Sequence, residues 1–169
     1  MKKTNGSIYV AVVFAALVAY FAYQWWFNPN RKIKARLGEI AAALSIPANE
    51  AELGRITRIA QLRKFVTADV HVVMGKHGAD LQSRDAVMAA VAAFTPPPGG
   101  WNVDFVDTDV RVNADDTARA FVTADVTTKD VQTSKETLSS REVTFSFVRQ
   151  DGDWLVRDAE VKDLPPTTP

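Results

Sequence analysis

The chain has 169 residues, with 20 basic and 20 acidic side chains and no cysteine. This length suits one domain with an appendage, and the charge balance argues against a generic nucleic-acid-binding protein, which carries a basic excess. The lack of cysteine excludes disulfide frameworks, thiol nucleophiles, cysteine zinc sites and iron–sulfur clusters.

The first feature along the chain is an apolar segment at residues 7–27, in which only Ser7 and Gln24 are not apolar. As a helix, its 21 residues would span about 31 Å, close to the thickness of a bilayer's hydrocarbon core. The alternative is a cleaved signal peptide, which needs a pair of small residues just past the apolar core. Bulky residues fill that zone at 23–27. The sequence therefore predicts a short tail at 1–6 and one transmembrane helix at 7–27.

Residues around this segment predict how it meets lipid and protein. Aromatic residues lie at its far end and basic residues follow it, as is typical of a membrane interface. The predicted interface residues are Trp25, Trp26, Arg31, Lys32, Lys34 and Arg36. A stripe of small residues predicts packing against a helix of an integral membrane partner. The stripe consists of Ala11, Ala15, Ala19 and Ala22. Solvated helix faces remain the alternative explanation of the basic residues.

Localisation follows from the same segment. Basic residues flank it on both sides and nearly balance, so the positive-inside rule decides little. We predict a single-pass protein of the bacterial inner (cytoplasmic) membrane, with its large domain on the periplasmic, external side.

The rest of the chain predicts one domain at 31–164, after a linker at 28–30 and before a Pro-rich tail at 165–169. Helical spacing of apolar residues predicts a first helix at about 31–45. A second is expected at about 49–64, capped by Asn49 with Glu52 at the capping-box position. Its predicted inward residues are Leu53, Ile56, Ile59 and Ala60. A third helix begins after Ser83.

Strands are predicted where the apolar period changes to two. The first is at 66–74, and longer ones are expected at 102–113, 117–128, 138–149 and 154–164. Asp151-Gly152 is a strong hairpin signal between the last two. Helices followed by an antiparallel run of strands indicate an α+β fold.

Two stretches, LQSRDAVMAAVAAF and RQDGDWLVRDAEV, complete a layout that resembles the nuclear transport factor 2-like superfamily over about 31–164. That superfamily includes SnoaL-like proteins, ketosteroid isomerase and scytalone dehydratase. The resemblance implies three helices packed on a curved, mainly antiparallel sheet, forming a cone that often holds a small apolar ligand. Its members range from enzymes to transport adaptors and assembly factors, so the fold does not decide the function.

The predicted domain contains few candidate catalytic residues. An isomerase-like site needs a carboxylate base and an oxyanion donor, usually tyrosine. The tyrosines, Tyr9, Tyr20 and Tyr23, all lie in the apolar segment. His71 with Asp69 is the remaining catalytic candidate, although strand alternation places both on the face away from the core. His71 and His77 lack metal-site spacing, so we expect no metal site and no cofactor.

Two functions remain open at this point. The first is a membrane-anchored, non-enzymatic accessory or scaffold subunit of a larger complex, with membrane lipid and integral membrane proteins as partners and a respiratory, photosynthetic or envelope-transport assembly as host. The second is a cone that binds a small apolar ligand or lipid, with a SnoaL-like or isomerase-like activity as its enzymatic form. A closed apolar core favours the first, and a hollow cone favours the second.

Overall fold

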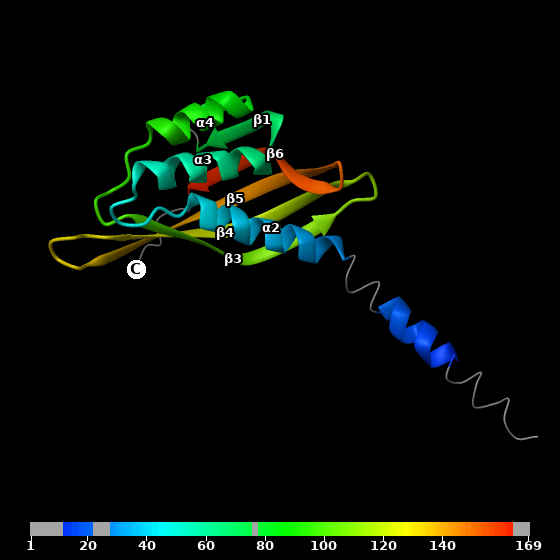
Figure 1. Cartoon of the computed structure of the whole chain (residues 1–169). Helices are drawn as coiled ribbons and strands as arrows, with labels where there is room; N and C mark the ends of the chain where they lie inside the picture. Colours follow the sequence, from blue (N-terminus) through cyan, green and yellow to red (C-terminus); the bar gives the residue numbers. More distant parts are fainter. Residues whose placement is uncertain (1–11, 22–27, 76–77, 164–169) are drawn as a thin grey trace, which may run out of the picture.

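The computed structural model describes residues 12–21, 28–75 and 78–163, and shows helices packed on one face of a curved sheet (Figure 1). The helices of this domain are α2 (Pro29–Leu44), α3 (Glu52–Phe65) and α4 (Arg84–Ala93). The strands are β1 (Val66–Met74), β2 (Asp80–Gln82), β3 (Trp101–Val112), β4 (Thr117–Lys129), β5 (Glu136–Gln150) and β6 (Asp153–Asp163). Residues 12–21 form a separate helix that extends away from the domain.

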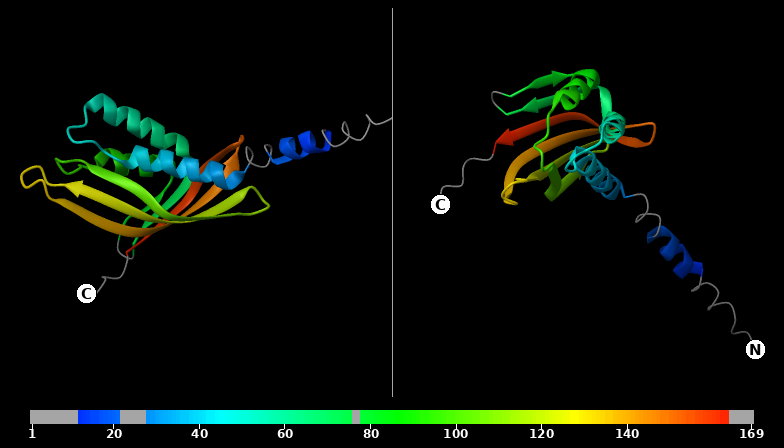
Figure 2. Two further views of the ribbon diagram at one scale, coloured as in Figure 1. Left: turned by 90° about the horizontal axis from the view of Figure 1, so that it is seen from below. Right: turned by 60° about the vertical axis from the view of Figure 1, so that its left-hand side comes forward.

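The sheet has the strand order β2-β1-β6-β5-β4-β3. Strand β1 pairs with β6 in parallel, and the other neighbouring strands are antiparallel. The pairing of β3 with β4 shifts register between Val106 and Asp109, where Asp107 has a φ of 47°. Such a bulge bends a strand, and Figure 2 shows the sheet curving around the helices. The predicted α+β architecture with a curved, mainly antiparallel sheet is therefore confirmed.

The four long strands begin and end within two residues of their predicted bounds. Between β5 and β6, Asp151 and Gly152 both have positive φ, 50° and 90°. Two successive positive φ angles are the conformation of a two-residue type I′ hairpin turn, which Asp-Gly favours. The hairpin prediction at this dipeptide is confirmed.

Helix α2 supplies the central apolar ridge against the sheet. Its residues Ile33, Leu37 and Ile40 are at most 5% exposed and share one core with Phe147. The helix begins two residues before the predicted position 31. The side chain of Asn28 accepts a hydrogen bond from the backbone N–H of Asn30, and proline occupies the first turn. Both features are typical helix starts, so part of the predicted linker at 28–30 is helical.

Helix α3 departs from the prediction. It begins at Glu52 without a side-chain cap, and Asn49 lies in the preceding turn with a φ of 59°. Asparagine tolerates this left-handed conformation, which is why it serves the turn rather than the cap. Of the predicted inward residues, Leu53 is 75% and Ile56 is 57% exposed. Ala60 is also exposed, and only Ile59 is half-buried.

The buried positions of α3 are instead Arg58 and Leu62. Arg58 makes a two-pronged ion pair with Glu50, from Nε to Oε1 at 2.9 Å and from Nη2 to Oε2 at 3.1 Å. With Arg58 facing inward in this pair, Leu53 and Ile56 lie on the exposed side of the helix. The apolar spacing alone does not reveal this, because an arginine is buried here only through its pairing with Glu50.

Strand β1 also interrupts the predicted alternation. Its register against β6 shifts between Val66 and His71, so that Thr67 is buried and Ala68 is exposed. Such a bulge reverses the faces on which side chains lie. Strand β2, which pairs with the end of β1, was not predicted because three residues are too few for a period to show.

All ten described residues of the N-terminal helix are aliphatic or aromatic. No helix in the described ranges combines the length and the hydropathy needed to cross a membrane. Most of the predicted helix at 7–27 lies outside the described residues, so the anchor itself stays a prediction.

Candidate functional site

The inside of the cone holds a cavity of about 290 Å³. All three helices of the domain and strands β1, β3, β4, β5 and β6 contribute to its wall. Its lining residues are Ile40, Leu44, Leu62, Phe65, Val66, Val70, Val72, Met74, Val87, Met88, Val91, Trp101, Val103, Phe105, Ala124, Val126, Arg141, Val143, Phe145, Val156, Ala159 and Val161. The volume lies near the lower end of the range of about 300–1,000 Å³ typical of small-molecule pockets. Alternating apolar residues of the predicted strands, such as Val70 of β1 and Val143 of β5, therefore border a hollow.

One side of the cavity is a fixed aromatic wall. The indole Nε1–H of Trp101 donates to the carbonyl oxygen of Leu44 at 2.7 Å, and Phe94 stacks on its ring at 4.7 Å between centroids. The backbone of Trp101 also exchanges two hydrogen bonds of 2.9 Å with Ile46. These contacts join the end of α2 to the first residue of β3, so the wall is in place before any ligand arrives.

Arg141 is the only charged side chain among the described lining residues. It stands on β5, two residues before the buried Val143, and is exposed to solvent. In the sheet it lies opposite the buried Ala124 of β4. The arginine therefore marks the point where the apolar lining meets water. One signal in the sequence could have identified it, since this arginine occupies an inward position in the period-two pattern of β5.

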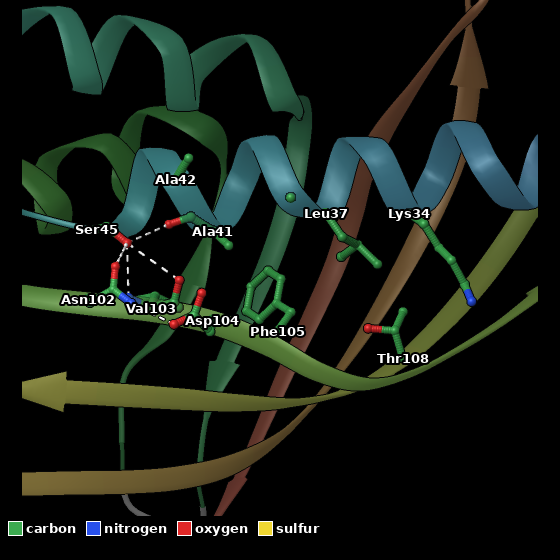
Figure 3. A pocket seen from close by; sticks show the side chains of 11 residues that line it. Lys34, Leu37, Ala41, Ala42, Ser45, Asn102, Val103, Asp104, Phe105 and Thr108 are labelled. Atoms are coloured by element: carbon green, nitrogen blue, oxygen red, sulfur yellow. Dashed lines mark hydrogen bonds between the residues drawn. The ribbon is translucent and has the colours of Figure 1, made fainter.

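A second hollow, larger and more polar, lies between α2 and β3 (Figure 3). Its volume is about 500 Å³. The hydroxyl of Ser45 accepts from the backbone N–H of Val103 at 2.9 Å and donates to the carbonyl oxygen of Ala41 at 3.0 Å. The side-chain amide of Asn102 donates to Asp104 at 2.5 Å. Because these polar groups form hydrogen bonds with neighbouring protein groups, we interpret the groove as the contact between α2 and the edge strand β3.

The predicted catalytic pair does not reach the cone. Val70 and Val72 line the cavity, so His71 between them points to the opposite face of the sheet. There its Nε2 lies 2.7 Å from Oδ1 of Asp80 on β2. Asp69 is exposed, and the nearby Thr67 hydroxyl, followed by its own backbone N–H, lowers the pKa of its carboxyl. A lowered pKa makes a carboxylate a weaker base.

The predicted interface residues that the structure describes fall on α2. Arg36 forms ion pairs with Glu39 at 3.0 Å and Asp153 at 3.2 Å, and its guanidinium lies 5.2 Å from the centre of the Phe65 ring. It thus joins α2 to α3 and to the start of β6. Lys34 borders the groove of Figure 3. Arg31 and Lys32 lie in the first turn of α2, while Trp25 and Trp26 lie outside the described residues.

The small-residue stripe is described only in part. Ala15 and Ala19 lie in the helix at 12–21 and are exposed, whereas Ala11 and Ala22 lie outside the described residues. The described part of the chain contains no group of three or more histidine, aspartate or glutamate side chains placed to hold a metal ion.

Comparison with known proteins agrees with this geometry. The SnoaL-like domain family matches residues 49–157. No curated protein matches the chain. Among solved structures, an NTF2-like protein with a cystatin-like fold from Novosphingobium aromaticivorans is similar with a TM-score of 0.69. It shares 15% sequence identity, over 90% of this chain and 92% of that one.

Two further structures share the fold. An uncharacterized protein with a cystatin-like fold from Caulobacter vibrioides has a TM-score of 0.62 and 17% identity, covering 81% of this chain and 90% of its own. A candidate scytalone dehydratase from Novosphingobium aromaticivorans also has a TM-score of 0.62, with 12% identity over 81% of this chain and 85% of its own. At these identities the likeness concerns the fold.

Proposed function

The chain belongs to the SnoaL-like domain family, and we propose that its cone binds a small apolar molecule. The superfamily that the chain resembles includes isomerases and dehydratases, and a candidate scytalone dehydratase shares its fold. The observation that carries the proposal is the cavity of about 290 Å³, whose described lining is apolar except for Arg141. Removing apolar surface from water is favourable and non-directional. A preformed apolar hollow therefore selects its occupant by size and by the lack of polar groups.

Binding without catalysis fits the lining better than an enzyme does. Acid–base catalysis requires a proton donor or acceptor within hydrogen-bond reach of the substrate. The described side chains around the cavity include no carboxylate, imidazole or phenol. Arg141 is a poor proton shuttle because its guanidinium stays protonated.

Filling the cavity tests this proposal. Val126 lines the cavity and is half-buried, so Val126→Phe places an aromatic ring in the space that a ligand would occupy. We expect the affinity for naphthalene, measured by calorimetry on the full chain in lipid nanodiscs with empty nanodiscs as blank, to fall about ten-fold or more.

The matched control is Val106→Phe, the same change on β3 at a residue that is 38% exposed and outside the cavity lining. It should leave naphthalene binding unchanged. Absence of naphthalene binding by the unmodified chain, or equal binding by both variants, contradicts a ligand-binding cone.

We also propose that the apolar segment anchors the domain in the bacterial inner membrane, where the protein serves as an accessory subunit beside an integral membrane partner. Its sequence supports this, and so does the exposure of every described side chain in residues 12–21, Phe14 at 68% among them. An apolar helix whose side chains are exposed on every side is suited to lipid. Ala15 and Ala19 lie on one face, where small side chains permit close helix packing.

The anchor is tested by Leu17→Arg combined with Val18→Arg. An arginine at the centre of a membrane helix costs about 2.5–3.5 kcal/mol on insertion scales, so we expect the double variant to leave alkali-washed membranes for the supernatant. As a control, Val131→Arg with Leu138→Arg adds the same charge at exposed positions of the domain. If both double variants fractionate alike, the segment does not anchor the protein.

A further inference from the structure

The outward side of α3 carries apolar residues that the domain itself does not cover. Leu53, Ile56 and Ala60 follow one another at spacings of three and four residues, so they lie on one side of the helix. All three are exposed, Leu53 at 75% and Ile56 at 57%. The buried side of the same helix is formed by Arg58 and Leu62. These three apolar residues, the α3 stripe, are therefore available for a contact outside the domain.

Helix α2 lies beside α3 on the same face of the sheet (Figure 1). The two helices run in opposite directions, since the guanidinium of Arg36, early in α2, lies over the ring of Phe65 at the end of α3. The exposed positions of α2 include the small residues Ala35, Gly38 and Ala42. Because such side chains project little, they leave the α3 stripe accessible to a flat surface.

Charge separates the helical layer from the rest of the domain. Residues 31–64, which contain most of α2 and nearly all of α3, hold eight basic and three acidic side chains, whereas residues 65–169 hold ten basic and seventeen acidic ones. Lys64 is exposed four residues after Ala60, on the side of the α3 stripe, and its neighbour Arg63 pairs with Asp85 at 3.1 Å. Anionic lipid headgroups attract basic surfaces and repel acidic ones. The charge pattern therefore matches an anionic bilayer on the helical side of the domain.

The proposed anchor would hold this helical side near a bilayer. Helix α2 begins at Pro29, eight residues after Phe21 in the N-terminal helix. Even a fully extended chain of this length spans at most about 29 Å. Because α3 runs back along α2, its last turn with Lys64 lies at the end of the helical layer that is nearest to the anchor. Leu53 lies only about 16 Å farther along the axis of α3, so the whole α3 stripe fits on a bilayer surface to which the helix lies parallel.

We propose that α3 lies along the surface of an anionic bilayer, with Leu53 and Ile56 inserted between the lipid headgroups and Lys64 against their phosphates. This inference rests on the proposed anchor and assigns a lipid contact to the domain itself. Helices that lie in the interface bury their apolar side by about 5–10 Å at the headgroup boundary. Two apolar side chains alone bind lipid weakly, and the anchor compensates for this by raising their effective concentration at the surface.

The test measures how close α3 comes to lipid in the full chain. The chain has no cysteine, so Ala60→Cys introduces a single site for a fluorescent label and leaves Leu53 and Ile56 in place. Nanodiscs that contain phosphatidylglycerol and a nitroxide-bearing phosphatidylcholine supply the quencher. We expect the label at residue 60 to be quenched more strongly than a label introduced by Val131→Cys, at a position 64% exposed between β4 and β5.

Leu53→Ser combined with Ile56→Ser should reduce the quenching at residue 60 to the level at residue 131, because the side chains that insert into lipid are lost. The matched control is Val131→Ser combined with Leu138→Ser, which removes two apolar side chains that are 64% and 62% exposed in the turn before β5 and in β5 itself. It should leave the quenching at residue 60 unchanged. Thermal unfolding of each variant shows that the domain remains folded.

The same assay tests the contribution of charge. Lys64→Gln should weaken the quenching at residue 60, and so should the replacement of phosphatidylglycerol by neutral lipid, because both remove an attraction between the helix and the headgroups. Raising the salt concentration should have the same effect in anionic nanodiscs, since exposed charges are screened. Equal quenching in neutral and anionic nanodiscs contradicts the anionic bilayer.

The outcomes separate this inference from the anchor on which it rests. Equal quenching at residues 60 and 131, in a chain that alkali-washed membranes retain, overturns the lipid contact and leaves the anchor in place. Quenching that survives Leu53→Ser with Ile56→Ser also overturns it. A label at residue 60 that is shielded from a water-soluble quencher in native membranes, yet is not quenched by nitroxide lipid, means that the α3 stripe binds a protein and not lipid. Loss of the unmodified chain from alkali-washed membranes overturns both proposals together.

Discussion

Trp154→Ala is expected to lower the free energy of unfolding by about 3–5 kcal/mol. Trp154 is 4% exposed and belongs to the main core, together with Ile33 and Leu37 of α2. It is the second residue of β6, directly after the Asp151-Gly152 turn. Removing the indole leaves a cavity between the helix and the sheet that the rigid hairpin cannot collapse to fill.

Denaturant unfolding followed by circular dichroism measures this loss, with full chains compared in one detergent. The control is Leu155→Ala, at the next residue of β6, which is half-buried and outside both core clusters. Its side chain points to the opposite face of the strand, so a clearly smaller loss is expected. Equal losses for the two variants would contradict the placement of Trp154 in the core.

The long antiparallel strands were predictable because their signals are local. Alternating apolar residues and turn residues at fixed positions specify both faces and ends, as at Asp151 and Gly152, whose φ angles are those that a type I′ turn requires. The helix cap at Ser83 was equally readable: its hydroxyl accepts from the backbone N–H of Ala86 at 3.2 Å. Signals of this kind need no knowledge of distant residues.

Features that depend on distant partners were not predictable in the same way. The parallel pairing of β1 with β6 joins residues about 90 positions apart, as His71 with Asp158, and nothing local specifies it. The bulge in β1 follows from that pairing. His71 was correctly placed away from the core, but its partner Asp80 was missed because β2 was not expected.

The cavity, too, was predictable from local signals only in part. The sequence predicts strands with alternating apolar residues, yet it does not say whether those residues fill the cone. That depends on the summed volumes of side chains from eight elements, among them small ones such as Ala124 and Ala159. The position of Arg141 at the edge of an apolar cavity likewise depends on residues from other strands and helices. The pattern of residues along the chain does not show which side chains surround a charged residue in the folded protein.

Glu50→Ala is expected to destabilise the domain by about 3 kcal/mol, although glutamate is usually a surface residue. The side chains of Glu50 and Arg58 are each 10% exposed and form two hydrogen bonds with each other. Removing the carboxylate leaves the guanidinium buried without its counter-charge, and breaking a buried pair in this way typically costs about 3–5 kcal/mol. Thermal or denaturant unfolding of the full chain measures the loss.

The double variant Glu50→Ala with Arg58→Met tests whether the loss of stability comes from the unpaired charge of Arg58. Methionine retains much of the apolar volume of arginine and needs no counter-charge, and replacing both partners of a buried pair is often close to neutral. We therefore expect the double variant to recover most of the stability that the single variant loses. A single-variant loss below about 1 kcal/mol is what a solvated surface pair gives, and it would mean that Leu53 and Ile56 are kept outside by something other than this ion pair.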